Sequence, residues 1–312
     1  MLRSTVRLLA AHPRLTAFLG AMSIAFSGVL YRFSDTSPET ATFFRCLWGL
    51  PILFAAAYIE RGSRGPMDRR AIGLAAFAGV LFAGDLIFWH HTINLVGAGL
   101  ATVLGNLQVV VVGIAAWLLF GERPTARTLV ALPIILVGVV FIAGILGGQN
   151  YGTDPQTGVL LGILTALSYG GYLLVIRRIS GRRTAGPVAI STASTAVVAL
   201  VVGFGLGSLD LTPGWESMFW LIVLGVSAQA IGYLFISLSL PRLPAVVTSI
   251  ILLSQPVVAV SLAMIILGET PSLGQLFGVV FVIGGIAFAT VPLSRLRRRP
   301  VNPATAPAIG PG

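Results

Sequence analysis

The sequence predicts an all-α, polytopic membrane protein whose ten transmembrane helices form two inverted five-helix repeats. Hydrophobic residues make up 56% of the 312 residues and charged residues only 10%, a composition that soluble domains do not have. Apolar runs of about 20 residues, long enough to cross a ~30 Å hydrocarbon core as helices, recur along the chain. The second half of the chain also repeats motifs of the first half.

The ten predicted spans follow one another with connectors too short for a soluble domain. They cover about 15–34, 40–59, 71–95, 97–120, 126–146, 156–177, 186–207, 215–240, 243–267 and 272–293. Residues 1–312 therefore form a single membrane domain, with repeat one over about 15–146 and repeat two over about 156–293. The first run lacks a clear cleavage site and is predicted to be an uncleaved helix. The Pro- and Gly-rich residues 294–312 are expected to be a flexible tail.

The distribution of basic residues predicts the orientation in the membrane. If the N-terminus is cytoplasmic, 18 of the 20 basic residues, all Arg, lie on that side: Arg3, Arg7, Arg14, Arg61, Arg64, Arg69, Arg70, Arg123, Arg127, Arg177, Arg178, Arg182, Arg183, Arg242, Arg295, Arg297, Arg298 and Arg299. The opposite connectors carry acidic residues and one basic residue, Arg32. This follows the positive-inside rule, so the net charge of +10 reflects topology and does not indicate nucleic-acid binding. Arg-only basicity with abundant Ala, Gly and Pro favours a bacterial inner-membrane protein with both termini cytoplasmic.

The internal repeat is clearest in two stretches, NLQVVVVGIAAWLLFGERPTARTL from residue 106 and LSQPVVAVSLAMIILGETPSLGQL from residue 253. At an offset of 147, Gln108 matches Gln255 and Glu122 matches Glu269. Because each copy has an odd number of spans, the copies run in opposite directions, which is the architecture of secondary transporters. The Gly-Glu-x-Pro turns themselves are expected to cap helices and so to mark the repeat.

The stretch GDLIFWHHTIN, residues 84–94, places polar residues inside a predicted span. Helix eight carries Gln229, Tyr233 and Ser237 at i, i+4 and i+8, and at the repeat offset His90 falls on the equivalent face. We therefore expect His90 on the wall of a central cavity, with Trp89 and Asn94 at its edges. Adjacent histidines diverge by about 100° on a helix, so the pair does not predict a metal site.

Asp85 and Arg45 are the two charges expected deep within spans, at similar depths. A lone charge at the bilayer centre costs roughly 2.5–3.5 kcal/mol on insertion scales. A structural ion pair between them is therefore the favoured interpretation. A proton-coupling role for Asp85 is the alternative.

Further hydrogen-bonding residues form stripes on predicted helices one, four and six. These candidates for substrate binding are Ser23, Ser27, Asn106, Thr165, Ser168, Tyr169 and Tyr172. Each Ser or Thr alone is also explained by helix packing, but matched stripes in both copies favour a shared cavity. Gly274-x-x-x-Gly278 indicates close helix packing.

Gln-x(12)-Gly-Glu-x-Pro followed by a helix ending Gly-x-x-Phe, present twice, resembles the EamA branch of the drug/metabolite transporter superfamily. Arg45 within TATFFRCLWGLPIL and the ten spans strengthen the resemblance. It implies a bacterial exporter of amino acids or other small metabolites, closest to the aromatic amino acid and methionine exporters. One departure is Val109, where the family usually has Pro in the fourth helix, whereas Pro256 keeps it in the ninth.

A cavity wall with little fixed charge favours a small neutral or zwitterionic substrate, most simply an amino acid exported by alternating access. Lipid is the other expected partner, and no nucleic acid, ATPase subunit, metal or cofactor is expected. The single cysteine, Cys46, offers neither a disulfide nor a cysteine metal site. The chain lacks a phosphate-binding GxxxxGK[ST] loop and any nucleophile–base arrangement, so it is not expected to be an enzyme. Alternatives are a multidrug or other metabolite carrier and a polar-lined channel.

Overall fold

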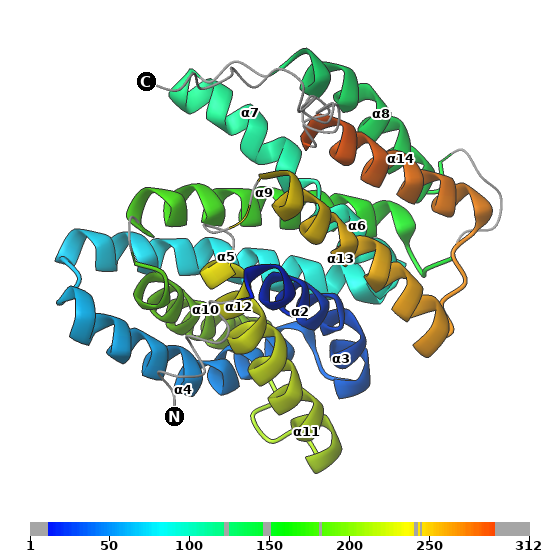
Figure 1. Ribbon diagram of the computed structural model, residues 1–312. Coiled ribbons are helices and arrows are strands. Elements are labelled where there is room, and N and C mark those ends of the chain that lie inside the picture. The colour runs from blue at the N-terminus through cyan, green and yellow to red at the C-terminus, as the bar shows by residue number, and fades with distance from the viewer. Residues whose placement is uncertain are drawn as a thin grey trace, which may run out of the picture.

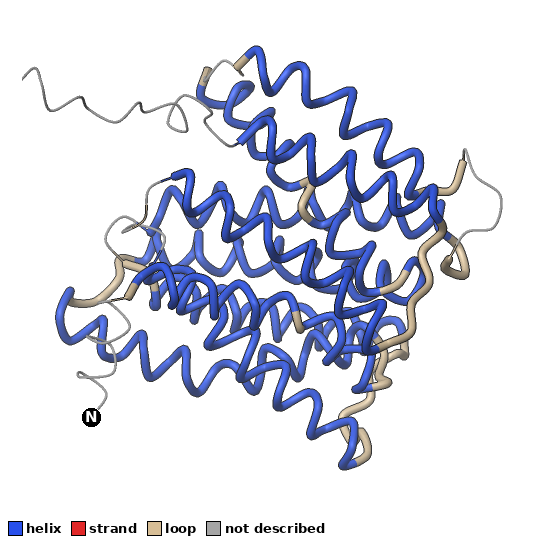
Figure 2. The backbone as a smooth tube through the Cα atoms, turned by 45° about the vertical axis from the view of Figure 1, so that its right-hand side comes forward, coloured by secondary structure: helices blue, strands red, loops and turns tan. Residues whose placement is uncertain are grey.

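The computed structural model describes residues 12–121, 125–145, 151–180, 183–239, 243 and 245–290. Within these ranges the chain forms helices and loops and no β-strand (Figure 2), which confirms the all-helical prediction. Eight helices or helix pairs are long and apolar enough to cross a membrane, and Ala126–Ile142 and Ile250–Ile266 are shorter apolar helices. The expected tail, 294–312, and Glu122 lie outside the described residues.

The first half of the chain contains seven labelled helices (Figure 1). They are α2 (Pro13–Ala25), α3 (Ser27–Ser34), α4 (Pro38–Arg64), α5 (Arg69–Val96), α6 (Ala98–Gly105), α7 (Gln108–Phe120) and α8 (Ala126–Ile142). The second half contains α9 (Pro155–Ser180), α10 (Ala185–Leu206), α11 (Trp215–Leu224), the π-helix η1 (Gly225–Gly232), α12 (Tyr233–Ser239), α13 (Ala245–Ile266) and α14 (Leu273–Thr290).

Helices from the two halves pack against each other across the molecule. The most extensive contacts join α5 to α9, α4 to α10 and α8 to α14, and α2 packs against η1 and α12. In Figure 1 the α4–α5 connection lies on the left and the α13–α14 connection on the right. The arginine-bearing helix ends that the structure describes, such as Arg64 and Arg69, thus gather at one end of the bundle, which we call the basic end.

Close packing of α8 and α14 depends on two glycines. A Cβ atom added at Gly278 would lie 2.6 Å from the Gly138 carbonyl oxygen, and one at Gly138 would lie 2.8 Å from the Gly278 carbonyl oxygen. Gly274, the other member of the motif, has no atom nearer than 3.8 Å to such a Cβ. Gly278 and Gly138 therefore allow the backbones to approach, whereas Gly274 does not serve this contact.

The interruption of the fourth span does not follow the positions of the prolines. Pro256 lies inside α13, which continues without interruption, whereas the fourth span is divided into α6 and α7 at Asn106 and Leu107. The Asn106 side chain donates to the Thr102 carbonyl oxygen at 2.8 Å. The Leu107 amide donates to the carbonyl oxygen of Leu104, three residues back, instead of to the residue four back as in a regular α-helix. A local side-chain bond of this kind competes with the helical ladder and explains a break without proline.

Candidate functional site

A cavity of about 470 Å³ lies in the middle of the bundle, within the size range of small-molecule sites. Its polar and charged lining residues are Ser27, Arg45, Asp85, Trp89, Thr102, Asn106, Gln108, Thr165, Tyr169, Tyr172, Tyr233, Gln255 and Thr290. Leucine, isoleucine and valine side chains complete the wall. The lining comes from helices of both halves of the chain.

The cavity extends toward the basic end of the bundle. There its lining reaches Ile176, Val188 and Ile236, which lie near the basic ends of α9, α10 and α12. In the other direction the lining reaches Arg45 and Thr102 and does not include the first turns of α4 and α6. The structure therefore places the deep end of the cavity away from the arginine-bearing connectors.

Arg45 lies at this deep end and is fixed from one side. Its Nε donates to Gln229 Oε1 at 3.1 Å, and its guanidinium carbon lies 5.6 Å from the centre of the Trp89 ring. Gln229 in turn donates to Thr192 Oγ1 at 3.1 Å. The Arg45 NH1 group has no hydrogen-bond partner, although the residue is only 2% exposed. A buried guanidinium with an unused donor on a cavity wall is suited to bind an anionic group.

Gln229 is held by an unusual helical segment. It belongs to η1, a π-helix between α11 and α12, and its side chain is fully buried. π-Helical segments are rare and often occur at functional sites. Here the segment turns Gln229 toward Arg45 and leaves Tyr233 on the cavity wall.

Asp85 also lies on the cavity wall, and it is 7% exposed. The ion pairs within 4.0 Å among the described residues are Arg64–Glu60 and Glu39–His91. The expected Arg45–Asp85 ion pair is therefore not formed, because the Arg45 guanidinium is directed to Gln229 and Trp89 instead. The cavity wall thus carries one positive and one negative side chain that are not in contact.

His90 does not lie on the cavity wall, contrary to expectation. It is fully buried, its Nδ1 lies 2.9 Å from Thr42 Oγ1, and its ring stacks on Tyr31 at 4.2 Å between ring centres. Asp85 and Trp89 occupy the cavity face of α5. At the repeat offset, Leu86 matches Tyr233 and both line the cavity, whereas His90, one turn further along α5, does not. The π-helix η1 departs from the constant angle per residue that the comparison of faces assumed.

The remaining predicted site residues divide into two groups. Ser27, Asn106, Thr165, Tyr169, Tyr172, Tyr233 and Trp89 line the cavity. Ser23, Asn94, Ser168 and Gln229 are not among its lining residues. Ser23 donates to the Ser227 carbonyl oxygen at 2.8 Å, and Asn94 bonds the Tyr31 hydroxyl. Ser237 belongs to α12, but its side chain lies outside what the structure describes.

An aromatic cluster forms one side of the cavity. Phe82 stacks on Tyr172 at 4.7 Å and meets Tyr233 edge-on at 5.5 Å, and Tyr169 stacks on Tyr172 at 5.6 Å between ring centres. Such rings present both apolar faces and hydroxyl groups to a ligand.

Sequence reasoning missed Gln108 and Gln255 as cavity residues. Both line the cavity, and Gln108 Oε1 is buried without a partner, as is Thr165 Oγ1. They are the two glutamines that match at the repeat offset, so their recurrence at equivalent positions was the signal that could have identified them.

At the end opposite the basic one, hydrogen bonds close the bundle. Glu269, 3% exposed, accepts from the Ala98 amide at 2.6 Å and the Gly99 amide at 3.2 Å, and so caps α6. The capping prediction for Glu269 holds, but the helix capped is α6 rather than the following helix. Gly97, at φ +92°, is needed there because a Cβ would lie 2.6 Å from Glu269 Oε2.

A second set of contacts closes the same end between α4, α5 and the loop after α10. Glu39 Oε1 lies 2.9 Å from His91 Nε2, and Ser208 donates to Glu39 Oε2 at 2.9 Å. Ser37 donates to the Ser208 carbonyl oxygen at 2.6 Å. Together with the Glu269 cap, these bonds join the helices at this end, whereas the cavity extends toward the basic end.

A bundle of helices long and apolar enough to cross a membrane, with a central cavity lined from both halves of the chain, is typical of membrane transporters. The sequence model of the EamA-like transporter family matches residues 14–144 and again residues 156–291. The chain therefore belongs to the EamA-like transporter family of the drug/metabolite transporter superfamily.

Similar proteins agree with this class. An uncharacterized transporter of Bacillus subtilis (strain 168), YdfC, is 24% identical over 304 residues, covering 96% of this chain and 95% of YdfC. An uncharacterized transporter of Archaeoglobus fulgidus is 25% identical over 277 residues, covering 87% of this chain and 93% of that protein. A solved structure titled "Crystal structure of protein" matches with a TM-score of 0.64 at 19% identity, over 89% of this chain and 98% of that one. The last match concerns the fold alone.

Proposed function

We propose that this protein is an inner-membrane secondary transporter that exports amino acids or closely similar zwitterions. The observation that carries the proposal is the presence of Arg45 and Asp85 on one cavity wall without an ion pair between them. A zwitterion offers each of them a partner, a carboxylate for Arg45 and an ammonium for Asp85.

The rest of the cavity wall agrees with a substrate of this kind. Tyr169, Tyr172 and Tyr233 line the cavity with aromatic rings that suit an apolar or aromatic side chain, and Phe82 packs behind them. Among the described residues of the lining, Arg45 is the one basic residue, whereas a phosphorylated substrate would normally be held by several Lys or Arg residues. The partnerless Gln108 Oε1 and Thr165 Oγ1 can accept or donate hydrogen bonds.

Transport by alternating access between two inverted repeats is the mechanism that we propose. The family model matches each half of the chain once, and α8 packs on its expected counterpart α14. Two inverted halves around a midplane site are typical of secondary transporters. The hydrogen-bonded end at Glu269, with a cavity that extends toward the basic end, would then belong to the cytoplasm-facing state.

The test is counterflow in proteoliposomes, with labelled amino acids, nucleosides and cationic drugs offered separately. We expect saturable exchange of one or more amino acids. Exchange of cationic drugs without any amino acid would assign the protein to multidrug transport instead. Large ion currents without saturable exchange would indicate a channel.

A further inference from the structure

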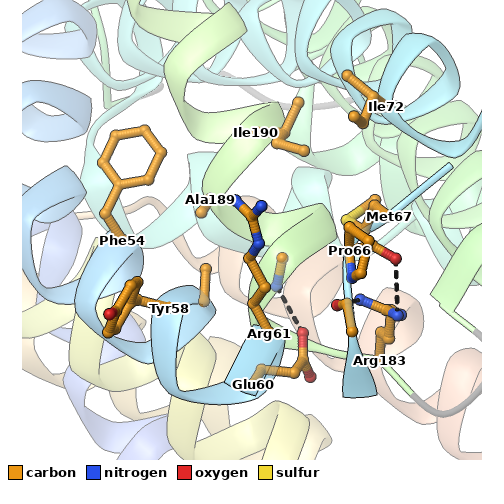
Figure 3. Close-up of a pocket in the computed structure, with 13 residues that line it drawn as sticks. Phe54, Tyr58, Glu60, Arg61, Pro66, Met67, Ile72, Arg183, Ala189 and Ile190 are labelled. Carbon is orange, nitrogen blue, oxygen red and sulfur yellow. Dashed lines mark hydrogen bonds between the residues drawn. The ribbon is translucent and has the colours of Figure 1, made fainter. Parts of the chain in front are cut away.

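A second hollow, of about 640 Å³, lies at the basic end of the bundle (Figure 3), and exposed residues such as Phe54 and Tyr58 line it. The end of α4, the α4–α5 connection and the start of α10 form it, and Ile72 contributes from α5. We call this hollow the α4–α10 groove. Its lining shares no residue with that of the central cavity, although Val188 of the central cavity and Ala189 of the groove are neighbours on α10.

The frame of the α4–α10 groove is held by two fully engaged charged groups. Arg183 donates to the carbonyl oxygens of Gly65 at 2.8 Å and Pro66 at 3.0 Å, and also to that of Arg64. Glu60 caps α10 by accepting from the amides of Thr184 at 2.7 Å and Gly186 at 2.8 Å. These bonds fix the α4–α5 connection against α10 and so define the shape of the groove.

Arg61 also lines the groove, but it takes no part in these hydrogen bonds. Its side chain extends into the groove toward Ala189 and Ile190 (Figure 3). No ion pair within 4.0 Å and no hydrogen bond joins its guanidinium to a described residue, whereas Arg64 lies 4.0 Å from Glu60. Arg61 is exposed, so an anion can reach it.

The groove walls next to Arg61 are apolar and open. Phe54 is 49% exposed, Tyr58 79% and Ile72 42%. Phe54 and Arg61 are seven residues apart on α4, which corresponds to about 10 Å along the helix axis. The groove therefore has a positive charge, Arg61, at one end and an apolar surface that includes Phe54 along its length.

We propose that the α4–α10 groove binds an anionic phospholipid of the cytoplasmic leaflet, with its phosphate at Arg61 and an acyl chain along Phe54, Ile72 and Ile190. The positive-inside rule assigns the basic end to the cytoplasmic side, where anionic lipids attract juxtamembrane basic residues. Tyr58, at the same level, is of the type enriched at membrane interfaces. A free phosphate would contact Arg61 and leave the apolar surface of the groove uncovered. A phospholipid can contact both the charge and the apolar surface.

The test uses the full-length protein in nanodiscs of phosphatidylcholine that contain a trace of phosphatidylglycerol with a photoactivatable group on its acyl chain. We expect crosslinks to concentrate on peptides from the ends of α4 and α10. Arg61→Gln should lower this labelling about fivefold, the effect of roughly one interfacial basic residue. Arg61→Lys should retain most of it.

The matched control is Arg127→Gln, which removes the same charge at the start of α8, outside the groove. It should leave the labelling unchanged. Equal labelling by a phosphatidylcholine probe would overturn the proposal, as would unchanged labelling of Arg61→Gln. Displacement of the probe by excess inorganic phosphate would show that the site takes a free anion rather than a lipid.

Discussion

Among single residues, Arg45 and Asp85 are two opposite charges that share a cavity and form no ion pair with each other. Arg45 is held by Gln229 and Trp89 with NH1 unused, and Asp85 faces the same space. Burying separated charges is costly unless each gains a partner. A zwitterionic substrate provides both partners at once.

Removing the Arg45 charge should weaken substrate binding. A hydrogen bond to a charged group contributes about 1.5–3 kcal/mol, so Arg45→Gln should raise KM for an amino acid at least tenfold in counterflow. Arg45→Lys should be intermediate, because an ammonium cannot form a two-pronged bond with a carboxylate. Arg127→Gln is the control, and a wild-type KM in Arg45→Gln would exclude Arg45 from the site.

Asp85→Asn should weaken amino acid binding to a similar extent, for it removes the charge that pairs with the ammonium group. The same variant tests proton coupling, because Asp85 is an ionisable group on the wall without an ion pair. If Asp85 carries the proton, an imposed pH gradient changes uptake by wild-type vesicles and leaves Asp85→Asn vesicles unaffected. A variant that binds amino acids as well as wild type would remove Asp85 from substrate recognition.

At the scale of helices, the Glu269 cap on α6 predicts which end of the cavity is shut. Glu269→Ala leaves two amides without their acceptor, and a buried unsatisfied group costs about 1–3 kcal/mol. In a Cys46→Ala background, a cysteine at Thr102 should then react about tenfold faster with a membrane-impermeant thiol reagent added to intact cells. Unchanged reactivity would show that this cap does not hold the outer end closed.

The same cap predicts a pH dependence of closure. Burial raises the pKa of Glu269 above its ordinary value of 4.5, and opening this end would expose the carboxyl and lower the pKa again. The closed state therefore binds the Glu269 proton more tightly than the open state does. When the pH falls from above the closed-state pKa of Glu269 toward its open-state pKa, closure should become more favourable. Slower labelling of the Thr102→Cys protein at lower pH, after correction for thiol reactivity, is the expected result. Glu269→Gln should abolish this dependence, and its persistence would assign it to another group.

Helix packing gives a prediction with a closely matched control. Gly278→Ala places a Cβ 2.6 Å from the Gly138 carbonyl oxygen, whereas a Cβ at Gly284 meets no atom within 4 Å. Overpacking of this kind costs about 1–3 kcal/mol. Gly278→Ala should lower the thermal unfolding midpoint in detergent by several degrees, and Gly284→Ala should not. Equal midpoints would mean that α8 and α14 separate without cost.

The positions of the helices were easier to predict from the sequence than the residues that each helix turns toward the cavity. Hydropathy located the spans because a bilayer requires long apolar segments, and α4 and α5 enclose the predicted runs 40–59 and 71–95. The prediction of which residues face the cavity was wrong for His90, where it relied on a comparison with an irregular helix. Asp85, Leu86 and Trp89 of α5 line the cavity and His90 does not, and η1 in the matching helix lacks the regular α-helical angle per residue. Periodicity cannot reveal a π-helix, because it assumes a constant angle per residue.

At the scale of the whole molecule, the residues of the cavity come from both halves of the chain and no single helix defines it. The sequence identified Tyr169, Tyr172 and Thr165 because they form a polar stripe within one helix. The contacts of Arg45 with Gln229, 184 positions away, depend on the tertiary arrangement and could not be derived from spacing. The same holds for the Glu269 cap on α6.

Recognition of a zwitterion by Arg45 and Asp85 can be measured by competition in counterflow with three matched ligands. These are an amino acid that the protein exchanges, the amine that lacks its carboxylate and the carboxylic acid that lacks its amino group. If Arg45 and Asp85 bind opposite ends of one zwitterion, only the intact amino acid competes well, and each truncated ligand is at least tenfold weaker. Equal competition by either truncated ligand would contradict recognition of a zwitterion.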